Sequence, residues 1–202
     1  MNKDLIRIIA DFPKPGIQFK DITPLLKNPE ALRLTTEMLI NPFTSQNIDV
    51  VVGLESRGFL FGANMAAQFH AGFVPVRKPN KLPSDKIFAE YQLEYGNDRV
   101  EMHADAIKPG EKVIIHDDLI ATGGTAAAAT DLVERLGGIV IGYSFIIELG
   151  FLNGKERLTK DAPVHALITL YVSLFEERYG KKPTLNRFRE KWAMQDLIDS
   201  VG

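Results

Sequence analysis

The sequence of 202 residues contains no cysteine. Disulfide bonds, thiolate catalysis and cysteine-ligated zinc or iron–sulfur sites are therefore excluded, and a reducing cytoplasm is compatible with this composition. No run of about 18 apolar residues, the length that a membrane-spanning helix needs, is present. The first residues, MNKDLIRIIADF, carry charges where a signal peptide has its apolar core. We therefore expect a cytoplasmic protein that makes no contact with a membrane.

An excess of charge of either sign is also missing. The 24 lysines and arginines nearly balance the 26 acidic residues, and the formal net charge is -2. Nothing in this balance indicates a nucleic-acid partner, so an anionic substrate would have to be held by local positive groups. Hydrophobic residues make up 45% of the chain, which is long enough for one domain with a sizeable core.

The order of the expected elements predicts an α/β fold. Apolar segments typical of buried strands occur at 50–52, 73–76, 113–115, 139–149 and 166–170, and helical patterns separate them at 59–70 and 126–136. This alternation predicts a doubly wound, mostly parallel, twisted sheet. Helical spacing is also present at 1–12, and a helix is expected at 29–40. The polar stretch 79–99 predicts an exposed hairpin or a mobile lid.

The segment 113–125, VIIHDDLIATGGT, joins a strand, two adjacent acids and a glycine-containing loop. Asp117 and Asp118 are expected at the carboxyl end of the strand, where open α/β sheets bind their ligands. The TGGT loop offers backbone N–H groups, threonine hydroxyls and a helix N-terminus to an anion. Paired acids suit vicinal hydroxyls, or a nearby divalent cation such as Mg²⁺. The segment therefore predicts a sugar-phosphate site, whereas the alternative is a tight turn with two exposed acids.

This segment resembles the phosphoribosyl-diphosphate signature of the type I phosphoribosyltransferases. The motifs PKPGIQFKDITPLL, VVGLESRGFLFG, VPVRKPNKLP and YQLEYG resemble, in order and spacing, the adenine-specific branch of that family over about residues 5–170. The resemblance implies a parallel sheet with a small N-terminal hood over the base site, to which about residues 1–28 contribute. It implies the conversion of adenine and 5-phosphoribosyl 1-diphosphate (PRPP) to AMP and diphosphate, with Mg²⁺, in a homodimer.

By the same resemblance, the PRPP site has two halves. Cations near the leaving diphosphate stabilise the charge that develops on it in the transition state. No protein side chain is expected to bind Mg²⁺ directly, since the ion would be held by the substrate diphosphate and water near the acid pair. The diphosphate half comprises Ser56, Arg57, Arg77, Lys78 and Lys81, and the ribose-phosphate half comprises Asp117, Asp118, Ala121, Thr122, Gly123, Gly124 and Thr125.

The resemblance also implies a base pocket and catalytic residues. Glu94 would handle the proton on a ring nitrogen of adenine as the new bond forms. Tyr95 would help to close the lid and to exclude water from the reactive sugar cation. Arg57 is the third expected catalytic residue. The base pocket is expected to comprise Gln18, Phe19, Lys20, Glu94 and Leu119.

Two departures from the family pattern leave alternatives open. Glutamine at position 18 stands at a commonly apolar site, so the same chemistry on a 6-oxopurine is an alternative. Residues 178–202 form a basic extension to a single domain at 1–177, and we expect a helix packed on that domain. This tail motivates a second alternative, a non-catalytic, ligand-sensing regulator on the same fold.

His116 is a third departure, because the family usually has an apolar residue just before the paired acids. A metal site formed by His116 with the acids is conceivable. Side chains alternate along a strand, however, so His116 should point away from Asp117. We therefore expect a packed, hydrogen-bonded histidine.

Overall fold

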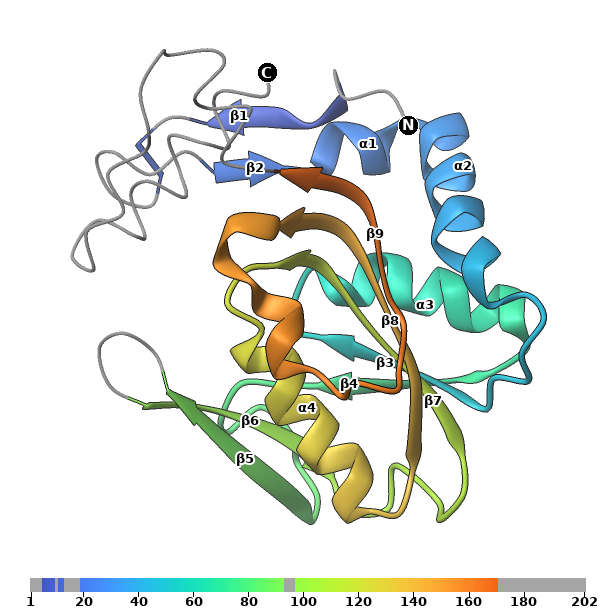
Figure 1. Ribbon diagram of the computed structural model, residues 1–202, viewed down its shortest axis with the longest axis vertical. Helices are drawn as coiled ribbons and strands as arrows, with labels where there is room; N and C mark the ends of the chain where they lie inside the picture. The colour runs from blue at the N-terminus through green and yellow to red at the C-terminus, as the bar shows by residue number, and fades with distance from the viewer. Residues whose placement is uncertain (1–4, 10, 13–18, 93–96, 171–202) are drawn as a thin grey trace.

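The computed structural model describes residues 5–9, 11–12, 19–92 and 97–170 (Figure 1). Its centre is a five-stranded sheet with the strand order β4-β3-β7-β8-β9, in which all neighbouring strands are parallel. The predicted α/β class with a parallel sheet is confirmed. The strands are β3 (Val50–Leu54), β4 (Gly72–Val76), β7 (Lys112–Ile120), β8 (Ile139–Leu149) and β9 (Val164–Leu170).

Helices cover both faces of this sheet (Figure 1). Side chains alternate along a strand, so β3 contributes to two separate cores. Val51 packs with Phe61 on the face that α2 and α3 cover, whereas Val50 and Val52 pack with Leu132 on the face that α4 covers. Burial on both faces explains why these strands are continuous apolar runs. The helices are α2 (Pro29–Ile40), α3 (Gly58–Phe69) and α4 (Gly124–Arg135).

An antiparallel hairpin packs on α4 and confirms the hairpin expected in the polar stretch 79–99. It consists of β5 (Lys86–Gln92) and β6 (Asn97–His103), and it lies apart from the main sheet in Figure 1. An isolated bridge between Arg77 and Glu101 joins β6 to the residue after β4. The hairpin therefore lies beside the end of β4, where the motif VRKPNKLP follows.

The N-terminal segment differs from the expected helix at 1–12. Arg7–Ile9 is a strand, β1, that pairs antiparallel with β2 (Phe19–Asp21), and α1 (Thr23–Lys27) follows. Arg7 lies opposite Asp21 in this pair, and their side chains form an ion pair of 2.6 Å. Pairing with β2 thus overrides the helical spacing of the apolar residues. Figure 1 shows β1 and β2 next to the carboxyl ends of β8 and β9, where the hood is expected.

Strand β7 is longer than the apolar pattern at 113–115 predicts. It continues through both acids to Ile120, because β8 offers pairing partners as far as Glu148. Asp117 and Asp118 therefore lie among the last paired residues of β7 and not in a loop after the strand. Short 3₁₀ segments complete the fold at Asn41–Phe43, Gly150–Leu152 and Gly154–Arg157.

The helix expected at 178–202 lies outside the described residues. Within the part of the chain that the structure describes, none of the helices has the length and apolar character needed to cross a membrane.

Candidate functional site

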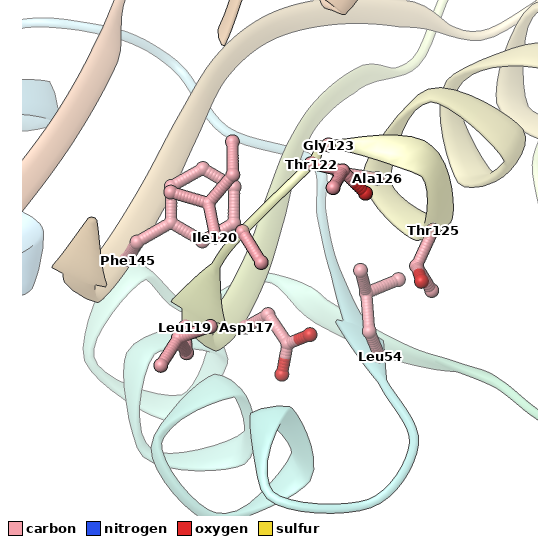
Figure 2. A pocket seen from close by; sticks show the side chains of 10 residues that line it. Leu54, Asp117, Leu119, Ile120, Thr122, Gly123, Thr125, Ala126 and Phe145 are labelled. Carbon is pink, nitrogen blue, oxygen red and sulfur yellow. The ribbon is translucent and has the colours of Figure 1, made fainter. Parts of the chain in front are cut away.

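A pocket opens at the carboxyl end of β7, next to the loop that leads into α4 (Figure 2). Figure 2 shows Asp117 from β7 and Leu54 from β3 on one side of the pocket, and the loop with Thr122 and Gly123 on the other. Gly123 has a φ of 77°, a left-handed conformation that glycine adopts without a Cβ clash. Helix α4 begins at the next residue, so its first unpaired N–H groups and its positive end lie beside this pocket.

The acid pair is asymmetric, because Asp118 is buried whereas Asp117 is half-buried. The Asp118 side chain is only 6% exposed, and its Oδ2 lies 2.9 Å from Nε of Arg57. The Asp118 backbone N–H donates to Oδ1 of Asp117 at 2.9 Å. Burial raises the pKa of Asp117 well above its usual range, and the neighbouring Asp118 charge raises it further. Burial also raises the pKa of Asp118, although the Arg57 guanidinium opposes this shift.

Asp117 differs from Asp118 in what surrounds its carboxylate. Within the described ranges, no lysine or arginine forms an ion pair with Asp117, and this side chain lines the pocket. A half-buried carboxylate of this kind is stabilised by hydroxyl donors or by a cation that brings its own charge. The arrangement can therefore bind a polyhydroxylated ligand whose anionic end lies in the loop.

Arg57 connects the acid pair to the N-terminal strands. Its Nη1 donates to the backbone oxygen of Lys20 at 2.9 Å, and its guanidinium carbon lies 4.6 Å from the centroid of the Phe19 ring. The residue follows a cis peptide bond between Glu55 and Ser56. Arg57 thus connects Phe19 and Lys20 of β2 with Asp118 of β7.

The three cations after β4 gather around acids of the same chain. The Glu55 side chain is 8% exposed and forms ion pairs with Arg77 and Lys81. It also accepts from the backbone N–H of Lys78 at 2.7 Å. Burial raises the pKa of Glu55, but the hydrogen bonds from Lys81, Lys78 and Arg77 outweigh it and lower this pKa to about 2. Glu55 is therefore a permanent anion that fixes these donors at the end of β3.

Lys78 has its own partners on the hairpin. Its Nζ donates to Oη of Tyr91 at 2.8 Å and forms an ion pair with Asp98. Burial lowers the pKa of Lys78, but the bonds to Asp98 and Tyr91 outweigh it and raise this pKa overall. The cation cluster is therefore tied to both the sheet and the hairpin.

Comparisons with known proteins identify this arrangement. A family model described as the phosphoribosyl transferase domain matches residues 21–174. The adenine phosphoribosyltransferase of Flavobacterium johnsoniae is 56% identical over 167 residues, which cover 83% of this chain and 98% of that protein. The chain belongs to the adenine phosphoribosyltransferase family. The family resemblance of the sequence motifs is thereby confirmed.

Solved structures of adenine phosphoribosyltransferases share the fold. The Rhodothermus marinus enzyme is 58% identical with a TM-score of 0.80, and the match covers 83% of this chain and 96% of that chain. The Saccharomyces cerevisiae enzyme is 45% identical with a TM-score of 0.75, over 82% of this chain and 95% of that chain. The yeast structure was solved with D-2,5-dideoxy-2,5-imino-altritol 1,6-bisphosphate and adenine.

Most residues that the adenine phosphoribosyltransferase motifs single out gather at one edge of the sheet. Leu119, Asp117 and the loop residues 121–123 and Thr125 line the pocket, and Gly124 is the first residue of α4. Ser56 is exposed just before α3. Gln18, Glu94 and Tyr95 lie outside the described residues, so the structure places none of them.

The structure also shows site partners that the motifs do not single out. Glu55 and Asp98 supply the anions for the cation cluster, and Gly154 contacts the loop at Ala121 and Gly123. Glu55 lies inside the motif GLESRGF and could have been found there, since a carboxylate next to predicted diphosphate ligands needs a cationic partner. Asp98 and Gly154 carry no comparable signal, because each lies in a segment without a chemical motif.

His116, which departs from the adenine phosphoribosyltransferase pattern, is packed as expected. Its side chain is fully buried, and Nδ1 lies 2.9 Å from the backbone oxygen of Ser144. Since a carbonyl oxygen only accepts, Nδ1 carries the hydrogen and Nε2 is the bare nitrogen. Nε2 has no hydrogen-bond partner among the described residues. Burial lowers the pKa of His116 to about 4, so the ring is neutral at physiological pH.

Proposed function

We propose that this chain is a purine salvage enzyme that transfers 5-phosphoribose from PRPP to adenine, giving AMP and diphosphate. The observation that carries the proposal is the pocket at the end of β7, where Asp117 and the loop that begins α4 line the same cavity and Asp118 follows Asp117 directly. The pocket offers carboxylate oxygens that accept hydrogen bonds from hydroxyl groups, a few residues from N–H groups that donate hydrogen bonds to a phosphate. A ribose 5-phosphate carries both hydroxyl groups and a phosphate and therefore matches this pattern. The family assignment supports adenine as the acceptor base.

The ribose-phosphate half consists of the loop and the two acids. Residues 121–125 hold the 5′-phosphate through backbone N–H groups, threonine hydroxyls and the positive end of α4. Asp117 and Asp118 accept hydrogen bonds from the ribose hydroxyls. The raised pKa of Asp117 supports this role, because a hydroxyl donor compensates its buried charge.

Mg²⁺ is the cofactor that phosphoribosyltransferases generally use with PRPP. The donor set fits this ion, since Mg²⁺ prefers oxygen ligands and keeps several of its waters. Asp117 and Asp118 would contact it through water, while the substrate diphosphate would bind it directly. Bound in this way, the ion neutralises charge on the diphosphate.

The diphosphate half consists of Ser56, Arg57 and the cation cluster Arg77, Lys78 and Lys81. Charge accumulates on the diphosphate as its bond to C1′ breaks, and these fixed donors stabilise that charge. Each of the four cations is already paired with a carboxylate of the chain. PRPP must therefore share the cations with these carboxylates or displace the carboxylates. This competition between charged groups makes PRPP binding dependent on ionic strength.

The base half lies at Phe19, Lys20 and Leu119, together with Gln18, Glu94 and Tyr95 from outside the described residues. Arg57 supports this placement, because it contacts Phe19 and Lys20 on one side and Asp118 on the other. Adenine bound there would attack C1′, and Glu94 would accept the proton that its ring nitrogen releases. Tyr95 would help to close the hairpin over the sugar cation.

The remaining features of the proposal concern assembly and location. We propose a homodimer in the cytoplasm. We further propose one catalytic domain at 1–177, with residues 178–202 as a basic C-terminal extension that packs on it as a helix. The family match at 21–174 supports this division, and the cysteine-free sequence is compatible with a cytoplasmic location.

A panel of free bases tests the proposal. Purified protein with Mg²⁺ and PRPP should form AMP from adenine and should turn over hypoxanthine, guanine or xanthine far more slowly, because a 6-oxopurine presents the opposite hydrogen-bond pattern. Glu94→Gln should still bind PRPP but turn over slowly. Preference for a 6-oxopurine would favour the first alternative. Nucleic-acid binding without turnover would favour the regulator.

A further inference from the structure

A short segment between β8 and β9, residues 150–159, packs against residues 121–125, which we call the phosphate loop. Figure 1 shows it as orange coils beside the start of α4. Gly154 in this segment is buried, and a Cβ added to it would lie 2.2 Å from the backbone oxygen of Ala121. A Cβ added to Gly123 would lie 2.1 Å from the backbone oxygen of Gly154. The two backbones therefore touch, and no side chain fits between them.

An ion pair with a buried carboxylate holds Lys155, the residue next to Gly154, although the lysine side chain itself is 48% exposed. Nζ of Lys155 lies 2.8 Å from Oε1 of Glu148, whose side chain is only 5% exposed. The other carboxylate oxygen, Oε2, accepts from Oγ1 of Thr169 at 3.1 Å. Glu148 pairs with Ile120 across the sheet, directly before the loop residue Ala121. Lys155 is thus bound to Glu148, which pairs with Ile120, the last residue of β7 before the phosphate loop.

A second anchor holds the far end of the same segment. Thr159 lies 3.3 Å from the buried hydroxyl of Tyr143, both through its backbone N–H and through its Oγ1. Tyr143 in turn lies 2.8 Å from Oγ1 of Thr130, which donates to the backbone oxygen of Ala126 at 2.9 Å. Ala126 belongs to the first turn of α4. The segment is therefore fixed to both sides of the loop, through β8 and through α4.

We propose that Lys155 is a positioning residue for the 5′-phosphate of PRPP. Its ion pair with Glu148 presses Gly154 against Ala121 and Gly123 and holds the loop in the conformation that presents its N–H groups. Removing the lysine leaves the buried Glu148 carboxylate without its cation and removes the tie between the segment and β8, so the segment can move. Because Gly154 touches the loop, that movement displaces the phosphate donors. The proposal rests on the proposed function of the loop.

Three variants test the proposal through direct binding of ribose 5-phosphate, measured by titration calorimetry. Lys155→Met keeps most of the length of the side chain and removes its charge. Lys155→Arg keeps the charge, and Lys160→Met removes an exposed lysine further along the chain as the matched control. We expect Lys155→Met to weaken ribose 5-phosphate binding about tenfold, since a small misplacement of binding groups is costly. Lys155→Arg and Lys160→Met should bind like the wild type.

Steady-state kinetics separate positioning from a general loss of structure. In Lys155→Met the KM for PRPP should rise by the same factor, while the KM for adenine and the kcat at saturating PRPP stay unchanged. Glu148→Gln should produce the same pattern, and it also serves if Lys155→Met does not fold. If Lys155 instead contacts the phosphate directly, Glu148→Gln should bind ribose 5-phosphate like the wild type. That result would overturn the positioning role.

Two further results would overturn the inference. One is unchanged ribose 5-phosphate affinity in folded Lys155→Met. The other is an equal rise of both KM values, which indicates a structural role alone. If instead the wild type neither binds ribose 5-phosphate nor forms AMP, the proposed function itself fails, and the inference fails with it.

Discussion

Replacing His116 with leucine removes a buried imidazole from the position before the acid pair and should make the fold less sensitive to acid. The wild-type imidazole is fully buried, and its Nδ1 is hydrogen-bonded to the backbone oxygen of Ser144. Protonation would place a second N–H and a full charge at Nε2, which has no partner in the described part of the chain. The fold therefore resists protonation, and the pKa of His116 is lowered to about 4.

The size of the effect follows from linkage. In the unfolded chain the imidazole titrates near 6.5, about 2.5 pH units above its value in the folded protein. At about 1.4 kcal/mol per unit, the folded state loses about 3 kcal/mol relative to the unfolded state as the pH falls from 6.5 to 4. Above pH 7 the imidazole is neutral in both the folded and the unfolded protein, so this loss of stability is absent. Leucine at this position cannot titrate, so the variant should not show this loss.

Urea unfolding at pH 7, 5.5 and 4.5 measures the difference. At pH 7 we expect the two proteins to agree within about 1 kcal/mol, because leucine removes an unsatisfied nitrogen but also removes one hydrogen bond. At pH 4.5 the variant should be the more stable protein. His70→Asn removes an exposed imidazole and serves as the matched control. Parallel pH profiles for the wild type and His116→Leu would refute the reasoning.

Substitutions around the site have equally defined outcomes. Glu55→Gln should lower the free energy of unfolding at pH 7 by about 1 kcal/mol, since its cationic partners are partly exposed and screened. The pKa of Glu55 is lowered to about 2, so this difference should shrink as the pH falls from 4.5 towards 2; urea unfolding at pH 7 and 3 checks it, and a constant difference would contradict it. Gly58→Ala places a Cβ 2.8 Å from the backbone of β7 and should lower the free energy of unfolding by about 1–2 kcal/mol. Gly72→Ala, whose Cβ has its nearest neighbour at 3.7 Å, should lower it much less. Equal stabilities of the two variants in thermal unfolding would show that α3 can move freely. Asp118→Asn should raise the KM for PRPP about tenfold, because a hydrogen bond to a charged group contributes about 1.5–3 kcal/mol and Arg57 loses its anchor; an unchanged KM would remove Asp118 from the site.

Elements with strong local signals could be predicted from the sequence. The helix expected at 29–40 is Pro29–Ile40, because Asn28 caps it by accepting from the backbone N–H of Ala31 and a proline follows. Strand β8 also agrees with its apolar run, Ile139–Leu149. In both cases the residues that define the element lie within it or beside it.

Elements that depend on distant partners could not be predicted in the same way. Arg7–Ile9 is a strand only because β2 pairs with it, and the sequence at 1–12 contains no trace of that partner. The extension of β7 through two acids likewise depends on β8, since adjacent acids are themselves poor strand formers. Local propensity is a weak guide wherever tertiary pairing decides the backbone conformation.

The candidate site shows the same division. The motif at 113–125 is chemically distinctive, so the sequence alone suggests a ribose-phosphate site there, and this role stays a prediction. The pairing of Glu55 with Lys81 joins residues 26 positions apart, and that of Lys78 with Asp98 joins residues 20 positions apart. Such pairs depend on the close approach of β3, β4 and the hairpin, which no local pattern specifies.

The formation of AMP from adenine and PRPP by the wild type and by the double variant Asp117→Asn, Asp118→Asn tests the central claim most directly. Both proteins should first be shown to unfold cooperatively, so that a loss of activity reports on the site. The wild type should form AMP and diphosphate in equal amounts, and the double variant should lose most of this activity and its affinity for ribose 5-phosphate. AMP formation at the wild-type rate by the double variant would contradict the placement of the phosphoribosyl group at the end of β7.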